Sequence, residues 1–147
     1  PLLNRDAVLE LIPHQGASCL LDDCLLWTET TLEASTRRHL EPDCPLRHNE
    51  HLGPVIAAEI AMQAAALHGA LTGGRRSTLG YLAALRALDL HCDRLDDPRY
   101  GSLLIRVTRD CAMVDGFVYG FTISAASGET LATGSGTVML HAAMETL

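Results

Sequence analysis

The longest apolar segment of the chain runs from Pro54 to Leu71 and is interrupted only by Glu59, Gln63 and His68. Apolar residues occupy the other fifteen positions, and seven of these are alanine. A helix with this composition is apolar around its whole circumference and needs other structure on every side. The pattern therefore predicts one long, buried helix in the middle of the chain.

The residues around this segment indicate where the helix begins and ends. Pro54 suits the first turn of a helix, and the glycine pair 73–74 suits the left-handed conformation that often follows a last turn. The preceding segment, Glu41–Gly53, is polar and contains Pro42 and Pro45. It is predicted to be a loop that leads into the helix.

The other segments of the chain show shorter patterns. Asn4 is a good N-cap for a short helix through Ile12. Leu20–Thr28 and Thr31–His39 are predicted to pair as a hairpin across Glu29 and Thr30. After the long helix, turn signals separate four predicted strands: Leu79–Cys92, Ser102–Asp110, Gly116–Ala125 and Glu129–Leu140. The first of these four is ambiguous, because residues 83–88 fit a helix as well as a strand.

The order of these elements restricts the architecture. A helix that is apolar all round is covered only if the sheet curls about it, which leaves edge strands to pair in a dimer. The sequence therefore predicts an α+β fold, a curled antiparallel sheet wrapped around one long central helix. We expect a single domain spanning residues 1–147.

Composition and charge narrow the classes of function. A chain of 147 residues with 48% hydrophobic composition can bury a core without disulfides or metals. The net charge of −7 and the aromatic content of 4% argue against nucleic-acid binding, which needs clustered positive charge and stacking groups. We expect no nucleic-acid partner.

The cysteines and the apolar segments indicate where in the cell the protein is expected. The five cysteines are odd in number and include no C-x-x-C pair, so a disulfide framework is not indicated and a reduced cytoplasm is the natural expectation. Residues 1–10 lack the basic-then-apolar pattern of a signal peptide. Charged and polar residues inside the long apolar segment would be costly in lipid, so no membrane span is predicted.

Glu59 and Gln63 are the first candidates for chemistry. Residues four apart project from the same face of a helix, and burial among alanines would disfavour the charged carboxylate and suit Glu59 to proton transfer. The alternative is a partly solvated glutamate near a helix start, favoured there by the helix dipole. Spacing alone leaves both interpretations open.

Several motifs in order resemble a known family. They are Leu11-Ile12-Pro13-His14-Gln15 with Leu20-Leu21-Asp22, Glu59 with Ala61-Met62-Gln63-Ala64, Leu79-Gly80-Tyr81-Leu82, and Gly128-Glu129-Thr130-Leu131-Ala132. In this order and spacing the chain resembles the hot-dog-fold beta-hydroxyacyl-acyl-carrier-protein dehydratases. It is most similar to the divergent dehydratase-like proteins of aryl-polyene and related fatty-acid-type biosynthesis clusters.

The resemblance implies an active site in a tunnel at a dimer interface. There a histidine of one subunit and the helix glutamate of the other would dehydrate a 3-hydroxyacyl thioester on a phosphopantetheine arm. Glu59 matches that glutamate directly. The family's histidine stands in a Gly-His-Phe-Pro-Gly stretch fourteen residues earlier, where this chain has Pro45. Counting from Glu41-Pro42 selects His48 as the substitute.

The other roles that the resemblance implies are these. His51 is a lesser candidate for the histidine, and His14 beside Pro13 would line the tunnel, contact the substrate or act as the base. Backbone N–H groups of Gly53 and Val55 would hold the thioester carbonyl, and Gln63 would orient Glu59 or a water. Arg75 and Arg76 follow the helix end, where they would meet the phosphate of pantetheine or the acidic carrier protein; the alternative is a solvated loop. The assembly would be a homodimer, or a heterodimer with a paralogue, and would need no cofactor.

Three alternatives stay open at this point. Cys44, His48 and His51 form a C-x3-H-x2-H pattern with metal-ligand residue types, although no second cluster completes a site and no metal is predicted. Hot-dog thioesterases also carry an acidic residue on the central helix, so thioester hydrolysis is a second enzyme class. The third is a degenerate subunit that binds an acyl chain or completes an active relative.

Other conspicuous side chains are expected to be structural. His68 is predicted to be a helix residue with a local hydrogen-bond partner. Trp27, Tyr81 and Met62 are predicted to lie in the core. Cys19 and Cys24 have no neighbouring base in sequence and are expected to pack as small apolar residues.

Overall fold

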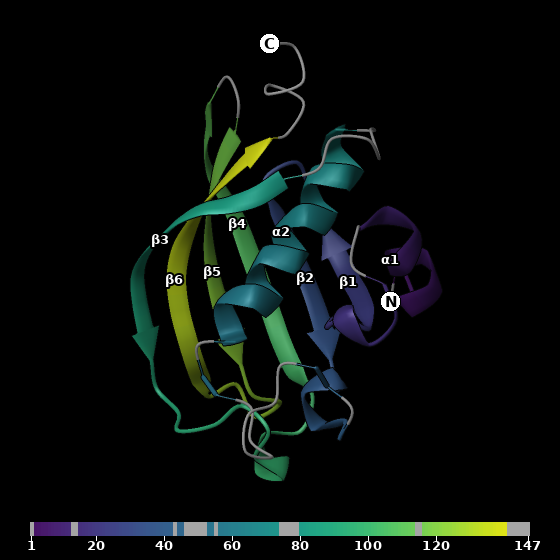
Figure 1. Ribbon diagram of the computed structural model, residues 1–147, viewed down its shortest axis with the longest axis vertical. Helices are drawn as coiled ribbons and strands as arrows, with labels where there is room; N and C mark the ends of the chain where they lie inside the picture. The colour runs from purple at the N-terminus through teal and green to yellow at the C-terminus, as the bar shows by residue number, and fades with distance from the viewer. Residues whose placement is uncertain are drawn as a thin grey trace.

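The central helix α2 (Ile56–Gly73) lies against one face of an antiparallel sheet of six strands, as far as the described residues show (Figure 1). The computed structural model describes residues 2–12, 15–42, 44–45, 53–54, 56–73, 80–113 and 116–140. Its other elements are α1 (Arg5–Leu11), β1 (Asp23–Trp27), β2 (Thr31–Thr36), β3 (Gly80–Leu90), β4 (Leu103–Met113), β5 (Gly116–Ser124), β6 (Thr130–Leu140) and the short 3-10 helices η1 (Gly16–Ser18), η2 (Arg38–Leu40) and η3 (Pro98–Tyr100).

Helix α2 is buried over most of its length, as its composition predicts. It contacts α1 and the strands β2, β3, β4, β5 and β6. Its alanines let the sheet backbone approach closely, and Ile60 and Leu67 fill the larger gaps at 1% and 0% exposure. The predicted α+β hot-dog architecture is confirmed, and the sheet stays open instead of closing into a barrel.

The sheet has the strand order β1-β2-β4-β5-β6-β3. Alternation along the strands decides which side chains meet α2, because successive residues point to opposite faces. One row across the sheet pairs Ala34 with Ile105, Ile105 with Ile123, and Ile123 with Ala132, and all four are buried. Arg106, one residue on from Ile105, points to the outer face and is exposed.

Three strand ends differ from the sequence prediction by three residues, and the other differences are smaller. The first strand begins at Asp23, not at Leu20, and the second ends at Thr36, not at His39. At two of these ends, side chains bind the backbone N–H groups that would otherwise pair in the sheet. The Leu20 N–H donates to the Gln63 side chain, and the Arg37 N–H donates to the Asp22 carboxylate. The strand expected to end at Asp110 continues to Met113, paired with β5.

The ambiguous segment 83–88 is a strand within β3. Its pairing with β6 decides the matter, because a neighbouring strand with free N–H and C=O groups outweighs a weak helix preference. The register shifts twice along this pair, and Ala87 adopts a positive φ of 53° next to the second shift, between Arg86 and Asp89. Such bulges re-aim a strand locally.

The two edges of the sheet differ. The outer edge of β1 is covered by the N-terminal segment, since Leu2 donates to the Cys24 carbonyl at 2.9 Å and Cys24 donates to the Leu3 carbonyl at 2.9 Å. Strand β3 is the last strand on the other side and is 11 residues long. Within the described residues no strand pairs with its outer edge, so β3 is the open edge of the sheet.

The expectations for individual side chains have mixed outcomes. Cys19 and Cys24 are fully buried and Met62 is 9% exposed, which confirms them as core residues. Trp27 is 37% exposed, so its assignment to the core is wrong. It lies near the end of the edge strand β1, where no further strand covers it. The side chain of Tyr81 lies outside the described residues.

No helix among the described residues is long and apolar enough to cross a membrane.

Candidate active site

Glu59 lies in the first turn of α2 and is partly buried. Gln63 follows one turn later and is 1% exposed. The Nε2 of Gln63 donates to Oε1 of Glu59 over 3.3 Å. The expected i, i+4 pair therefore forms, and the carboxylate is neither sealed in the core nor fully solvated.

The orientation of the Gln63 amide is determined by its other partners. The N–H of Leu20 can only donate, and it lies 2.7 Å from Oε1 of Gln63. The carbonyl of Ser18 can only accept, and it lies 2.9 Å from Nε2. These two contacts fix which end of the amide is oxygen. The remaining hydrogen of Nε2 is thereby the one directed to Glu59.

The segment that holds Gln63 is the loop Gln15–Asp22, which we call the clamp loop. It contains η1, with Gly16 at a positive φ of 57°. Gln15 anchors its start to α1 by donating to the carbonyls of Leu9 at 2.6 Å and Ile12 at 3.2 Å. Leu20, in the second half of the motif that resembles the family's tunnel lining, thus lies against the helix face that carries Glu59 and Gln63.

The start of α2 is a turn closed by backbone hydrogen bonds. Ile56 donates to the carbonyl of Gly53 at 3.2 Å, and Ala57 donates to that of Pro54 at 3.0 Å. Backbone N–H groups at a helix start favour negative charge, as on a developing enolate.

Most other predicted site residues lie outside the described residues. They are Pro13, His14, His48, His51, Val55, Arg75 and Arg76. Their roles remain predictions. Pro45, which stands where the family's histidine would be, is described and exposed, and its side chain cannot transfer a proton.

The alternative of a metal site rests on Cys44, His48 and His51, in the segment that precedes α2. Of its three residues only Cys44 is described, and it is 6% exposed. Among the described residues no group of three or more His, Cys, Asp or Glu side chains gathers in a way that could hold a metal ion. The C-x3-H-x2-H pattern therefore stays a sequence hypothesis.

His68 belongs to a separate network on the sheet-facing side of α2. Its Nε2 lies 2.8 Å from the Thr28 carbonyl, so this nitrogen carries the proton, and its Nδ1 accepts from the Tyr119 hydroxyl at 2.7 Å. Burial, and secondarily the charge of Arg109, lower the pKa of His68. The expected hydrogen-bond partner exists, but it comes from distant segments rather than locally. Both ring nitrogens are engaged, so His68 is not a candidate base.

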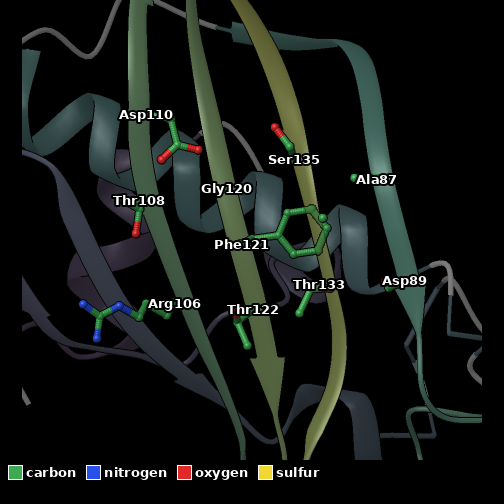
Figure 2. Close-up of a pocket in the computed structure, with 11 residues that line it drawn as sticks. Ala87, Asp89, Arg106, Thr108, Asp110, Gly120, Phe121, Thr122, Thr133 and Ser135 are labelled. Carbon is green, nitrogen blue, oxygen red and sulfur yellow. The ribbon is translucent and has the colours of Figure 1, made fainter.

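A concavity lies on the outer face of the sheet (Figure 2). It is an open groove of about 580 Å³ between β3, β4, β5 and β6, with α2 behind the strands. Its floor includes Gly120, and its walls carry Asp89, Arg106 and Asp110 together with threonine and serine hydroxyls. It is separated from Glu59 by the sheet and does not belong to the same site.

Comparison with known proteins gives the family. The model of the ApeP-like family, described as ApeP dehydratase, matches residues 6–147. The chain belongs to the ApeP-like family. This confirms the resemblance recognised in the sequence. It also confirms the predicted function, dehydration of 3-hydroxyacyl thioesters in aryl-polyene biosynthesis. The predicted enzyme class, a hydro-lyase, is confirmed as well.

Solved structures share the fold at low sequence identity. A chain of the dehydratase heterocomplex ApeI:P from Xenorhabdus doucetiae superposes with a TM-score of 0.77 at 20% identity, covering 94% of this chain and 91% of that one. A thioesterase from Haemophilus influenzae gives 0.65 at 13% identity, with coverages of 94% and 90%. A hypothetical thioesterase from Streptococcus pneumoniae, solved with coenzyme A, gives 0.58 at 12% identity, with coverages of 80% and 84%. No curated protein matches the chain in sequence.

Sequence reasoning missed the groups that hold Gln63. Neither Ser18 nor Leu20 has a side chain that suggests a site, because each contributes only backbone. The nearest signal in the sequence is Arg5, a basic residue in the first turn of α1. That position usually favours acidic residues, so an arginine there indicates acceptors close by.

Proposed function

We propose that this ApeP-like chain supplies the glutamate half of a composite dehydratase site for 3-hydroxyacyl thioesters carried on an acyl carrier protein. The observation that carries the proposal is the partly buried Glu59, held by the N–H of Gln63 on the face of α2 against the clamp loop. A carboxyl group at the edge of the core can both bind the substrate hydroxyl and exchange a proton with it.

The proposed roles follow from the reaction. A neutral imidazole takes the proton from C2 of the acyl group, and the electron pair of that C–H bond forms the C2=C3 double bond. The C3–O bond breaks, and the hydroxyl leaves as water with a proton from Glu59. Proton transfer from the imidazolium back to the Glu59 carboxylate restores the site. Backbone N–H groups at the start of α2, from Gly53 and Val55, would hold the thioester oxygen while negative charge builds on it.

We infer that the imidazole comes from a second subunit. Pro45 at the position of the family's histidine supports this, as does the existence of a two-chain dehydratase, the ApeI:P heterocomplex, with the same fold. The open edge strand β3 is the natural place for the second subunit to extend the sheet, because its outer N–H and C=O groups need partners. Arg75 and Arg76 follow α2 in sequence and would contact the acidic carrier protein.

A homodimer is the second candidate assembly. In that case His48 of one copy would face Glu59 of the other, with His14 and His51 as weaker candidates. The count from Glu41-Pro42 is the observation that favours His48. Thioester hydrolysis is a weaker alternative: solved thioesterases share the fold, but the family assignment is to dehydratases.

The test is an assay of the chain alone and of the chain mixed with a hot-dog dehydratase subunit that has the Gly-His-Phe-Pro-Gly stretch. The substrate is a 3-hydroxyacyl-carrier-protein thioester, and mass spectrometry follows the acyl group. The proposal predicts enoyl product only from the mixture. Enoyl product from the chain alone would favour the homodimer, release of free carrier-protein thiol would favour hydrolysis, and no product from either would contradict the proposal.

A further inference from the structure

We propose that Arg5 is a positioning residue for Glu59, acting through the clamp loop and Gln63. The inference rests on the proposed function, since it assigns a role within the same site. Among the described residues, Arg5 makes no hydrogen bond to Glu59 or Gln63. Its effect would instead pass through three carbonyl groups of the clamp loop.

The contacts of Arg5 are unusually concentrated. Its NH1 donates to the carbonyls of Leu21 at 2.6 Å and Cys19 at 3.1 Å, and its NH2 donates to the carbonyl of Gly16 at 2.9 Å. The loop therefore bends around one guanidinium group. A planar, five-donor group is the side chain that can hold three acceptors at once, whereas a lysine ammonium acts as a point charge.

These contacts bracket the two groups that orient Gln63. The carbonyls held by Arg5 belong to residues 16, 19 and 21, and the groups that contact Gln63 belong to Ser18 and Leu20, which lie between them. With the carbonyls of residues 16, 19 and 21 held by Arg5, the Ser18 carbonyl and the Leu20 N–H are directed toward α2. Arg5 thereby sets the direction of the Gln63 amide, and the amide sets the donor presented to Glu59.

A charge cluster extends the same arrangement toward the loop of the candidate histidines. Asp22, at the end of the clamp loop, lies 3.8 Å from NH1 of Arg5 and 3.0 Å from Nε of Arg38. Its carboxylate also accepts the N–H of Arg37 at 2.7 Å. Arg38 begins η2, which leads into the segment 41–53. The cluster therefore ties the clamp loop to the start of that segment.

The position of Arg5 supports a specific role. It stands at the first residue of α1, where the helix dipole disfavours a cation. The side chain is only partly exposed, at 25%. An arginine at this place is explained by the carbonyls it binds rather than by helix stability.

The test is a double-mutant cycle in the assembled dehydratase with Arg5→Met and Gln63→Met. If Arg5 acts through Gln63, each single variant lowers kcat by roughly tenfold to a hundredfold, as expected when a catalytic group is misplaced, with a smaller change in KM. In the double variant the two effects do not multiply, because residues that act as one unit are non-additive. Effects on kcat that multiply would overturn the inference.

Two further variants separate positioning from folding. Arg5→Lys keeps the positive charge facing Asp22, so it should recover most of the melting temperature but little of kcat. Recovery of both to the same degree would mean that Arg5 is only a structural residue. Arg106→Met is the matched control, because Arg106 also makes an ion pair, with Glu33 at 3.2 Å, but lies on the outer face of the sheet. It should leave kcat unchanged.

A measurement that does not depend on catalysis tests the role of Arg5 independently of the proposed function. Amide hydrogen exchange of the Leu20 N–H reports its bond to Gln63 directly. Arg5→Met should speed this exchange at least about tenfold relative to the wild type and to Arg106→Met, since the loop loses its anchor. A wild-type assembly without turnover would count against the proposed function, and the exchange of Leu20 would then decide the inference by itself. Unchanged exchange would overturn it.

Discussion

The two ends of α2 carry polar clusters of opposite character. Near its start, Glu59 and Gln63 face the clamp loop, and Glu59 remains partly exposed. Near its end, His68 is fully buried against the sheet, and both of its ring nitrogens are bonded within the protein. Both clusters lie on the same helix, so their surroundings make the difference.

The difference between the clusters indicates that one can take part in catalysis and the other is structural. In the buried cluster the donor of each hydrogen bond is determined. Arg109 donates to the Tyr119 hydroxyl at 3.2 Å, and Tyr119 donates to His68. His68 in turn donates to the Thr28 carbonyl. The same arginine reaches Thr72 at 2.7 Å and lies over the Phe117 ring. Such a network joins β4, β5 and the β1–β2 turn to α2. A group so fully engaged cannot take a substrate proton, whereas Glu59 lies at the surface of the core.

The largest expected effect is on turnover, from Glu59→Gln. Loss of a positioned acid should lower kcat of the assembled dehydratase by roughly a hundredfold to ten-thousandfold. The melting temperature should change little, because glutamine keeps the size of the side chain and can still accept from Gln63. The measurement is the initial rate of enoyl product with each variant at equal folded concentration. A rate equal to that of the wild type would rule out Glu59 as the acid.

The buried cluster should show the reverse pattern. His68→Leu leaves the Tyr119 hydroxyl and the Thr28 carbonyl without their partner, which costs about 1–3 kcal/mol in the free energy of unfolding for a buried group left unsatisfied. The rate per folded molecule should stay near that of the wild type. Urea unfolding gives the first quantity and the rate assay gives the second. His68→Gln, which keeps a donor and an acceptor, should lose less stability; a large fall in kcat with unchanged stability would reverse the assignment.

Stability should also depend on pH through His68. Its pKa is lowered in the folded protein by burial and by Arg109, while the unfolded chain has a value of about 6.5. Between the two values the unfolded chain binds more protons, so this contribution is fully present above about pH 6.5 and is lost as the pH falls below it. Urea unfolding from pH 7.5 down to pH 5 should show a shallower pH dependence in His68→Leu than in the wild type. Identical slopes would mean that His68 is not the titrating group.

The smallest expected effect is at the outer face of the sheet. Arg106 is more than half exposed, and its ion pair with Glu33 is a surface pair, so Arg106→Met should change the free energy of unfolding by about 1 kcal/mol or less. Neither kcat nor the pH dependence should move. A clear loss of turnover would indicate that the groove of Figure 2 takes part in the reaction.

The sequence predicts the fold well because its strongest pattern is also its strongest physical constraint. An apolar helix such as Pro54–Leu71 has few ways to be covered, and alternation in segments such as Leu103–Val107 assigns their faces. The strand ends were less predictable, since Leu20 and Asp22 use bonds to distant residues instead of ladder pairing. Only the residue type of Trp27 predicts a place in the core, and residue type carries no information about a position on an edge strand.

The site could be predicted only in part. The spacing of Glu59 and Gln63 shows that they share a face, but it does not show which backbone groups meet that face. Ser18 and Leu20 contribute a carbonyl and an N–H that every residue type has, so their role appears only in three dimensions. Likewise, the pairing of His68 with Tyr119 joins residues 51 apart in sequence. The histidine of the reaction stays a prediction among His48, His14 and His51 or belongs to a second subunit.

The most direct test of the central claim is the structure of the assembled dehydratase with a 3-hydroxyacyl pantetheine amide, an analogue whose amide linkage disfavours elimination. The account predicts that a carboxylate oxygen of Glu59 lies about 2.6–3.2 Å from the C3 hydroxyl oxygen of the analogue. It also predicts an imidazole on the C2 side of the acyl group. An acyl group bound away from Glu59, with the carboxylate turned from it, would contradict the account.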